Sequence, residues 1–386
     1  MAVCSFLGHS GIYDADIDAV LQTAVEQLSV EYGYVDFWIY PHGKFTERCL
    51  LAALRAKTHY PTRVTITLAV PLIRSEDYSE QNISGIPFCM IDKVITHEVP
   101  PPSQRDYSVS YKKMMQWIME NSTHLICYIY KNIYTQENQL LKIAKNKSKA
   151  EIISITNAET KQFIMESSVF MSDRERFIFN KMNEGKRPTE AAALVGLSIE
   201  RSRQVLYHGC KMIRRKLDWR YYKTLTEKDQ RGMACGIFGI GEATEETLSS
   251  FIHTVSFLIF TYGIKDFYVE YSCARSDFVH ALTSCTTLHH PIHITAVTGS
   301  RVHPESHDAP GNIAEAVCPP CDALECIGWT DRDNTSDNFR VIADIADRSD
   351  FCICNTSAYL LTTDLQKHVF QNKTTILLDL SKGLIK

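Results

Sequence analysis

Hydrophobic positions recur along the chain with two different periods. Short apolar runs, typical of buried strands, occupy 3–7, 35–40, 64–70, 125–130 and 152–155. Between the first two runs, residues 17–28 repeat apolar positions at the three- and four-residue spacing of one helix face. Strands that alternate with helices predict a parallel sheet with helical crossovers, so this part of the chain is expected to form an α/β, Rossmann-like domain.

The same order of elements recurs after about residue 233. Strand-like runs occupy 234–238, 267–271, 292–297, 351–354 and 376–380, and a helical pattern covers 248–259. Cys4 precedes Asp36 by 32 residues, and Cys235 precedes Asp266 by 31. The chain is therefore predicted to contain an internal duplication: two Rossmann-like parallel-sheet domains with an all-α segment inserted between them. Each copy also has a long loop, at 73–108 and 299–336, which is expected to line a site or cover a sheet edge.

The inserted segment has the pattern of three short helices. Ser172 and Glu175 form a capping-box pattern, Pro188 takes the first position of a second helix, and Ser198 caps a third after a turn at Gly196. The positions expected to be apolar and packed are 177, 178, 182, 191, 192, 194, 206, 210, 213 and 217. This pattern predicts a helix-turn-helix.

The predicted domains are 1–157, 158–228 and 229–386, with the core of the helix-turn-helix at 171–217. Short connectors at 156–170 and 221–232 are expected to join it to the two sheets.

The charge of the chain is unevenly distributed. The net charge is −4, but residues 171–223 contain 13 Lys or Arg and 6 Asp or Glu, a local charge of +7. A basic module on an otherwise acidic chain is typical of polyanion binding, although a solvated helix face gives the same count.

The third helix carries a specific resemblance. Its residues 197–207, LSIERSRQVLY, followed by 213–217, IRRKL, resemble region 4 of sigma factors and related regulators, with Ser202 where that family commonly has an apolar residue. In the family this helix enters the major groove of DNA. The resemblance implies DNA-binding roles for Lys186, Arg187, Ser198, Glu200, Arg201, Arg203, Gln204, Lys211, Arg214 and Arg215. Of these, Glu200, Arg201, Arg203 and Gln204 would face base edges, and the basic residues at 186, 187, 211, 214 and 215 would contact phosphates.

The first 155 residues also resemble the SLOG superfamily of nucleotide-binding Rossmann-like domains. The matching turns, 8–11 and 41–47, follow the first two strands, where open parallel sheets bind ligands. The resemblance implies a nucleotide-derived ligand at Gly8, His9, Ser10, His42, Gly43, Lys44 and Thr46. Enzymes of that superfamily have two further glycines where this chain has His42 and Phe45, and a catalytic glutamate where it has Cys49. No catalytic residue is therefore predicted, and the second copy, with residues 272–277 in the equivalent loop, departs further.

The cysteines are expected to be reduced and to act as small core residues, because several fall inside strand-like runs. Cys318, Cys321 and Cys326 with His303 and His307 have only partial zinc-ligand spacing, so no metal or other cofactor is predicted. No apolar run is long enough to span a bilayer, and a cytoplasmic protein without membrane contact is expected.

Three classes of function remain open. The favoured prediction is a sequence-specific transcriptional regulator that binds double-stranded DNA, alone or as a homodimer. Its first sheet domain is expected either to bind a nucleotide-like ligand that controls it or to serve as a structural scaffold, and a scaffold is favoured for the second. The first alternative is a non-catalytic nucleotide-binding or protein-interaction module that does not bind DNA. The second is an enzyme similar to nucleoside-monophosphate phosphoribohydrolases.

Overall fold

The computed structural model divides the chain into two compact units. It describes residues 2–72, 86–98, 107–131, 133, 135–184, 186–228, 232–240, 244–270, 277–287, 290–298, 323–326, 334–354 and 376–380. The first unit contains Met1–Ala53, Thr62–Arg74 and Val94–Gln230, and therefore combines the first sheet with the helical module. The second contains Arg231–Lys386 together with Leu54–Pro61 and Ser75–Lys93.

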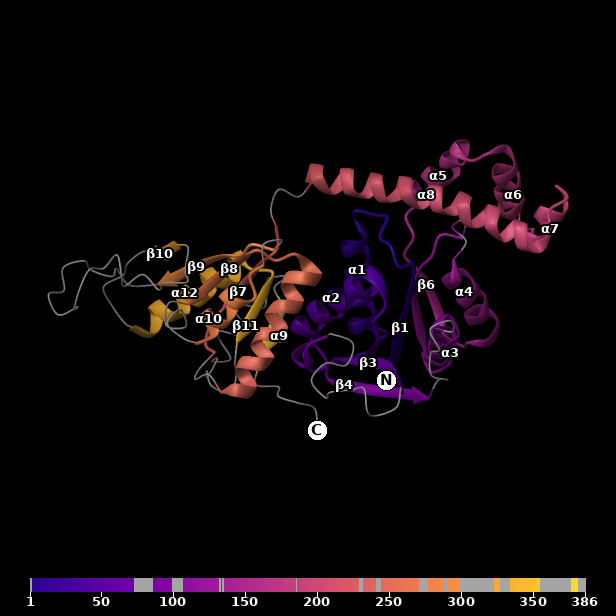
Figure 1. Ribbon diagram of the computed structural model, residues 1–386. Coiled ribbons are helices and arrows are strands. Elements are labelled where there is room, and N and C mark those ends of the chain that lie inside the picture. Colours follow the sequence, from indigo (N-terminus) through magenta and orange to yellow (C-terminus); the bar gives the residue numbers. More distant parts are fainter. Residues whose placement is uncertain are drawn as a thin grey trace. The chain divides into compact units, whose positions relative to one another are not determined.

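A six-stranded parallel sheet forms the centre of the first unit. The strand order is β4-β3-β2-β1-β5-β6, the order of a doubly wound fold. Its strands are β1 (Ala2–Gly8), β2 (Val35–Ile39), β3 (Val64–Leu72), β4 (Lys93–Glu98), β5 (His124–Tyr128) and β6 (Glu151–Ser154). Four helices connect them: α1 (Ile17–Glu31), α2 (Gly43–His59), α3 (Tyr107–Glu120) and α4 (Gln136–Lys147). Figure 1 shows α1 and α2 on one face of the sheet and α3 and α4 on the other.

The second unit repeats this topology. Its strand order is β10-β9-β8-β7-β11-β12, which matches the first sheet strand for strand. Its strands are β7 (Ala234–Ile237), β8 (Asp266–Glu270), β9 (His293–Thr298), β10 (Ala323–Cys326), β11 (Phe351–Cys354) and β12 (Ile376–Asp379). Its helices are α9 (Glu245–Tyr262), α10 (Asp277–Ser284) and α12 (Asn334–Arg348). The predicted fold class, two Rossmann-like α/β domains with parallel sheets, is confirmed.

Both long loops predicted from the sequence contain a strand that the sequence did not reveal. Strand β4 lies within 73–108 and β10 within 299–336, and each forms the outermost strand of its sheet. The residues of β4 are either exposed or half-buried, and none is buried. An edge strand of this kind lacks the continuous apolar run that marks a central parallel strand.

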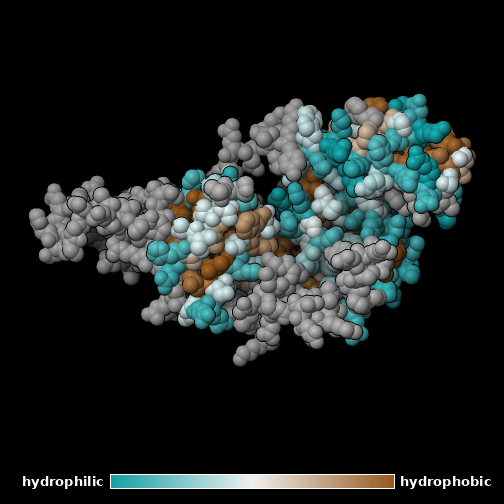
Figure 2. Space-filling model, in the orientation of Figure 1, coloured by the Kyte–Doolittle hydropathy of each residue, from teal (hydrophilic) through white to brown (hydrophobic). Residues whose placement is uncertain are grey.

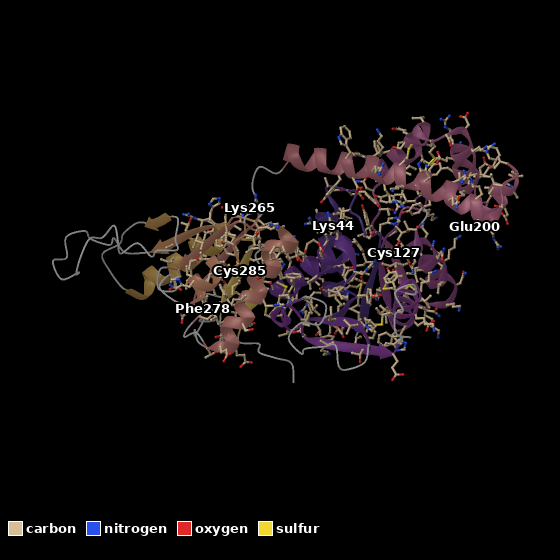
Figure 3. The ribbon with its side chains drawn as sticks, viewed as in Figure 1. Lys44, Cys127, Glu200, Lys265, Phe278 and Cys285 are labelled. Atoms are coloured by element: carbon tan, nitrogen blue, oxygen red, sulfur yellow. The ribbon has the colours of Figure 1, made fainter. Side chains whose placement is uncertain are left out.

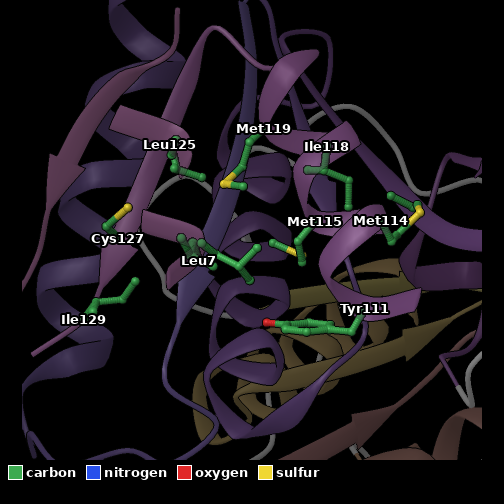
Figure 4. Close-up of a cluster of buried hydrophobic side chains, with 12 residues drawn as sticks. Leu7, Tyr111, Met114, Met115, Ile118, Met119, Leu125, Cys127 and Ile129 are labelled. Carbon is green, nitrogen blue, oxygen red and sulfur yellow. The ribbon is translucent and has the colours of Figure 1, made fainter. Parts of the chain in front are cut away.

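One layer of the core of the first domain lies between the sheet and α3. Tyr111, Met114, Met115, Ile118 and Met119 of α3 are buried against residues of β1, β5 and α4. Figure 4 shows these side chains interdigitating with Leu7, Leu125, Cys127 and Ile129. Burying each such side chain contributes about 1.5–3 kcal/mol, so this layer anchors the sheet that supports the turns described below.

Cysteines belong to these cores. The nine cysteines whose side chains the structure describes are reduced thiols that form no disulfide, and all of them are buried. Burial raises the pKa of Cys4, Cys235 and Cys352 above the ordinary value, so these thiols are neutral and pack as small apolar groups. Among the described helices, none is long and apolar enough to cross a membrane.

The helical module begins earlier and ends later than the predicted trihelical core. It consists of α5 (Ala158–Glu166), the 3-10 turn η3 (Ser167–Phe170), α6 (Asp173–Asn183), α7 (Pro188–Ala193) and α8 (Ile199–Lys228). The segments expected to be connectors are thus mostly helical. Residues 218–228 contain neither glycine nor proline, and Tyr221 extends the buried face of α8, so nothing ends the helix near residue 217.

Candidate nucleic-acid interface

Three helices of the module pack around a small apolar core. Ile178 of α6, Ala191 and Ala192 of α7 and Leu206 of α8 are buried together. The small alanines allow α7 to approach its neighbours closely, as the helix-turn-helix prediction requires. Gly196, in the turn between α7 and α8, has φ of +69°, a conformation that favours glycine.

The helix caps follow the sequence prediction. Ser172 and Glu175 form a reciprocal capping box at the start of α6, and Pro188 takes the first turn of α7. The Ser198 hydroxyl accepts a hydrogen bond from the Arg201 backbone N–H at 3.3 Å and so caps α8. The Ser198 side chain, predicted to contact DNA, therefore holds the start of α8 in place.

Two apolar positions of the module were predicted wrongly. Leu194, expected to face the core, is 57% exposed, because it follows the last residue of the short helix α7. Phe177, also expected in the core, is 37% exposed and lies under the Lys181 ammonium group, 5.8 Å from the ring centroid.

Helix α8 has two opposite faces. Its buried face is formed by Leu206, Cys210, Ile213 and Leu217, as predicted. The opposite face exposes Arg201, Gln204, Lys211 and Arg215, which recur at intervals of three, seven and four residues and therefore lie along one stripe of the helix. We call these four residues the polar stripe. Figure 2 shows hydrophilic residues over much of the visible surface of the module.

The N-terminal end of α8 exposes side chains of both charges. Glu200 and Arg201 are exposed in the first turn, and Figure 3 shows Glu200 at the right-hand end of the module. The Arg201 Nη1 donates to Gln204 Oε1 at 2.9 Å, which holds these two side chains side by side. The side chain of Arg203 lies outside the described residues.

Two further predicted phosphate contacts precede α7. Lys186 and Arg187 are exposed in the turn between α6 and α7. The Arg187 guanidinium lies 3.9 Å from a carboxylate oxygen of Glu190, an exposed pair that binds weakly and leaves the guanidinium accessible. The turn thus adds positive charge to the same module.

Arg214 differs from its neighbour Arg215. Arg214 is half-buried, its Nε donates to the Cys210 carbonyl at 3.4 Å, and it lies 5.7 Å from the Tyr207 ring centroid. Its positive charge also acts on His9 and Tyr13 of the first sheet domain. Arg214 therefore lies on the side of α8 that faces this domain, whereas Arg215 is exposed to solvent.

A buried carboxylate ties α6 to α8. Glu175 Oε1 lies 2.6 Å from His208 Nδ1, and Oε2 accepts hydrogen bonds from the Ser172 backbone N–H and hydroxyl, each at 2.8 Å. Burial raises the pKa of Glu175, but the hydrogen bonds from His208 and Ser172 outweigh it, so the pKa lies below the ordinary value. His208 was not identified from the sequence, since its partner is 33 residues away.

A second buried carboxylate ties the module to the sheet. Asp14, which follows β1, accepts hydrogen bonds from the Tyr130 hydroxyl and from the Thr160 hydroxyl of α5. The Tyr130 hydroxyl also accepts from the Asn157 backbone N–H at 3.0 Å, and Asn157 caps α5. These contacts fix where α5 begins relative to the carboxyl ends of β1 and β5.

The predicted nucleotide loop lies at the switch point of the first sheet. There the strand order reverses between β1 and β5, which is where open α/β sheets bind ligands. Gly8 faces the Phe45 ring, and a Cβ built on Gly8 would lie 2.2 Å from Phe45 Cδ1. Phe45 in turn stacks on Tyr128 with 5.2 Å between ring centroids. Aromatic side chains of the protein thus fill the crevice, and a nucleotide phosphate at Gly8 would have to displace Phe45.

His9 is part of this packing. It is 1% exposed, its Nε2 accepts a hydrogen bond from the Tyr130 backbone N–H at 2.8 Å, and its Nδ1 lies 3.2 Å from Thr135 Oγ1. Burial, with a smaller contribution from the charge of Arg214, lowers the pKa of His9 to about 4. The imidazole is therefore neutral at pH 7, and both of its ring nitrogens already contact other groups of the protein.

The remaining residues of the loop are brought together around the start of α2. The Lys44 backbone N–H donates to the Ser10 carbonyl at 3.1 Å, and Gly43, with φ of +80°, lies close to Ser10. The Thr46 hydroxyl donates to the His42 carbonyl at 2.9 Å. Two groups of the first turn of α2 that could bind an anion are therefore occupied within the chain.

Cys49 lies one turn further along α2, at the position where the enzymatic relatives have a carboxylate. It is fully buried, and burial raises the pKa of its thiol well above the ordinary value. A neutral buried thiol supplies neither an acid nor a base at this loop.

The candidate metal ligands fall outside the part of the chain that the structure can test. Cys318, Cys321, His303 and His307 lie outside the described residues, and the side chain of Cys326 is not described. Most of the second copy's loop, 272–276, also lies outside them. Within the described residues, no group of His, Cys, Asp or Glu side chains has the arrangement of a metal site.

No known protein family model matches the chain, and no curated protein is similar to it.

Proposed function

We propose that the protein is a sequence-specific DNA-binding regulator that contacts DNA through the helical module. The observation that carries the proposal is the polar stripe of α8, which lies exposed opposite a fully buried apolar face. An α-helix with this division fits the major groove of B-DNA, where side chains at its N-terminal end reach base edges.

The proposal assigns different tasks to the two ends of the stripe. Arg201 and Gln204 lie in the first two turns of α8 and are exposed, so they are placed to hydrogen-bond to bases. Lys211 and Arg215 lie two to three turns further along and supply charge for phosphates. Lys186 and Arg187 add charge from the turn before α7.

The local charge supports a polyanionic partner. The module carries a net charge of +7 between residues 171 and 223, whereas the whole chain carries −4. The rest of the protein therefore repels DNA, and binding should be confined to the module. The filled crevice at Gly8 and the buried Cys49 thiol give no comparable support to a phosphoribohydrolase activity.

The salt dependence of binding tests the proposal. Each phosphate contact releases condensed counterions, so the affinity of the protein for duplex DNA should fall steeply with salt. The variant Lys211→Gln/Arg215→Gln should bind every sequence more weakly and reduce the slope of log K against log salt by about 1 for each residue. Fluorescence anisotropy of a labelled duplex measures both quantities.

A matched control removes two exposed lysines outside the module. Lys147→Gln/Lys149→Gln takes the same charge from α4 and the residues after it, and should leave the slope unchanged. If the α8 variant has the slope of the wild-type protein, or if both variants lower it equally, the polar stripe does not contact phosphates and the proposal fails.

A further inference from the structure

A cavity lies beside the filled crevice, between the first sheet and the helical module. It has a volume of about 540 Å³, within the range of small-molecule sites, and opens between α4, α5 and the carboxyl ends of β5 and β6. Aliphatic side chains line its interior, and lysines from three elements line its opening. Figure 3 shows Cys127 in the sheet below the module.

The interior of the cavity is aliphatic. Ile129 and Ile164 are buried, Leu141 and Ile152 are half-buried, and Met165 closes one side from α5. Burial raises the pKa of the Cys127 thiol to about 12, so this group is neutral as well. Such a surface favours an alkyl chain, because each CH₂ group that leaves water for an apolar surface adds to the binding free energy.

The walls offer little to a nucleobase. Among the described residues of the walls, Tyr130 is the one aromatic residue, and it is 1% exposed, with its hydroxyl bonded to Asp14 and Asn157. The described walls therefore offer a base no exposed ring on which to stack.

The rim is positively charged. Lys131 follows β5, Lys145 belongs to α4 and Lys161 belongs to α5, so three separate elements each place an exposed ammonium group at the opening. Within the described part of the chain, no Asp or Glu lines the cavity and none of the three lysines forms an ion pair. The charge of Lys145 acts on Cys127, which places this lysine near the aliphatic interior.

We propose that this cavity binds an aliphatic carboxylate, with the alkyl chain against Ile129, Ile152 and Ile164 and the carboxylate among Lys131, Lys145 and Lys161. A converging set of cations over an apolar interior is complementary to such an amphiphile, because the charged head stays at the hydrated rim while the chain leaves water. The site does not depend on DNA binding, and its ligand would contact both the sheet and α5.

Calorimetric titration of the full chain with decanoate tests the site. Decanoate should bind, and decanamide, which has the same chain without the charge, should bind more weakly. Lys145→Gln/Lys161→Gln should weaken decanoate binding about tenfold, because two of the three exposed ammonium groups that attract the carboxylate are removed. Met165→Trp, a change at an exposed position that narrows the cavity, should also weaken it.

Two controls test whether decanoate binds in this cavity. Lys147→Gln removes an exposed charge from α4 outside the cavity and should leave decanoate binding unchanged. Adenosine monophosphate should not compete with decanoate. The proposal is overturned if decanoate does not bind, if neither cavity variant weakens it, or if the nucleotide displaces it.

Discussion

The buried His9 allows a direct test of whether the crevice of the first sheet domain is filled by protein side chains. A histidine that is free to meet a phosphate titrates near its ordinary pKa of 6.5, whereas the pKa of the buried His9 is lowered to about 4. The unfolded chain therefore binds a proton at His9 below about pH 6.5, and the folded chain does not until about pH 4. Folding stability contributed by the neutral imidazole is complete above pH 6.5 and is lost as the pH falls from 6.5 toward 4.

The size of this loss follows from the two pKa values. Each unit of difference corresponds to about 1.4 kcal/mol, so the full separation from 6.5 to about 4 amounts to roughly 3 kcal/mol. At pH 5 the folded histidine is still mostly neutral, and the linkage relation gives a loss of about 2 kcal/mol relative to pH 7.5.

The variant His9→Gln isolates this contribution from the other titrating groups. The Gln amide oxygen can accept the hydrogen bond from the Tyr130 backbone N–H but does not titrate. Urea unfolding at pH 7.5 and pH 5 should therefore show that the wild-type protein loses about 2 kcal/mol more than the variant. Tryptophan fluorescence suits the measurement, since Trp38, Trp117 and Trp219 belong to the first unit. Equal losses in the two proteins would show that His9 is accessible and that the crevice is open.

Two further changes test the local packing. Gly8→Ala should lower the free energy of unfolding by about 1–3 kcal/mol, because the added Cβ clashes with Phe45. Phe45→Leu in the same chain should restore part of that free energy. A thermal unfolding midpoint that Gly8→Ala leaves unchanged would contradict the close contact. Glu175→Gln should lower stability by about 1 kcal/mol at pH 7, because the carboxylate caps α6 and bonds His208. The pKa of Glu175 is lowered, so this difference should shrink as the pH falls below 4.5, and a difference that is constant with pH in urea unfolding would refute the role of the charge.

The sequence predicted the central strands well because buried parallel strands are continuous apolar runs. Strands such as β1, β5 and β11 are buried almost throughout and agree with their predicted runs to within a few residues. The caps at Ser172 and Ser198 were also predictable, since a cap depends on residues three positions apart.

Features that depend on residues far apart in the chain were not predictable. Phe45 fills the space at Gly8 from the next helix but one, and Asp14 bonds Thr160 across 146 positions. No local pattern distinguishes these side chains from others of their type. The lysines around the cavity come from three separate elements and become a group only when β5, α4 and α5 meet.

The central claim is that α8 reads the sequence of double-stranded DNA, and selection from a randomised duplex library tests it most directly. The wild-type protein should enrich a recurring motif. Arg201→Ala/Gln204→Ala should lose the preference at one or two base pairs of that motif, at about 1–3 kcal/mol each, while Lys211→Gln/Arg215→Gln retains the motif with lower affinity. Two results would contradict the account: the wild-type protein enriches no motif, or the Arg201→Ala/Gln204→Ala variant enriches the same motif with undiminished preference at every base pair.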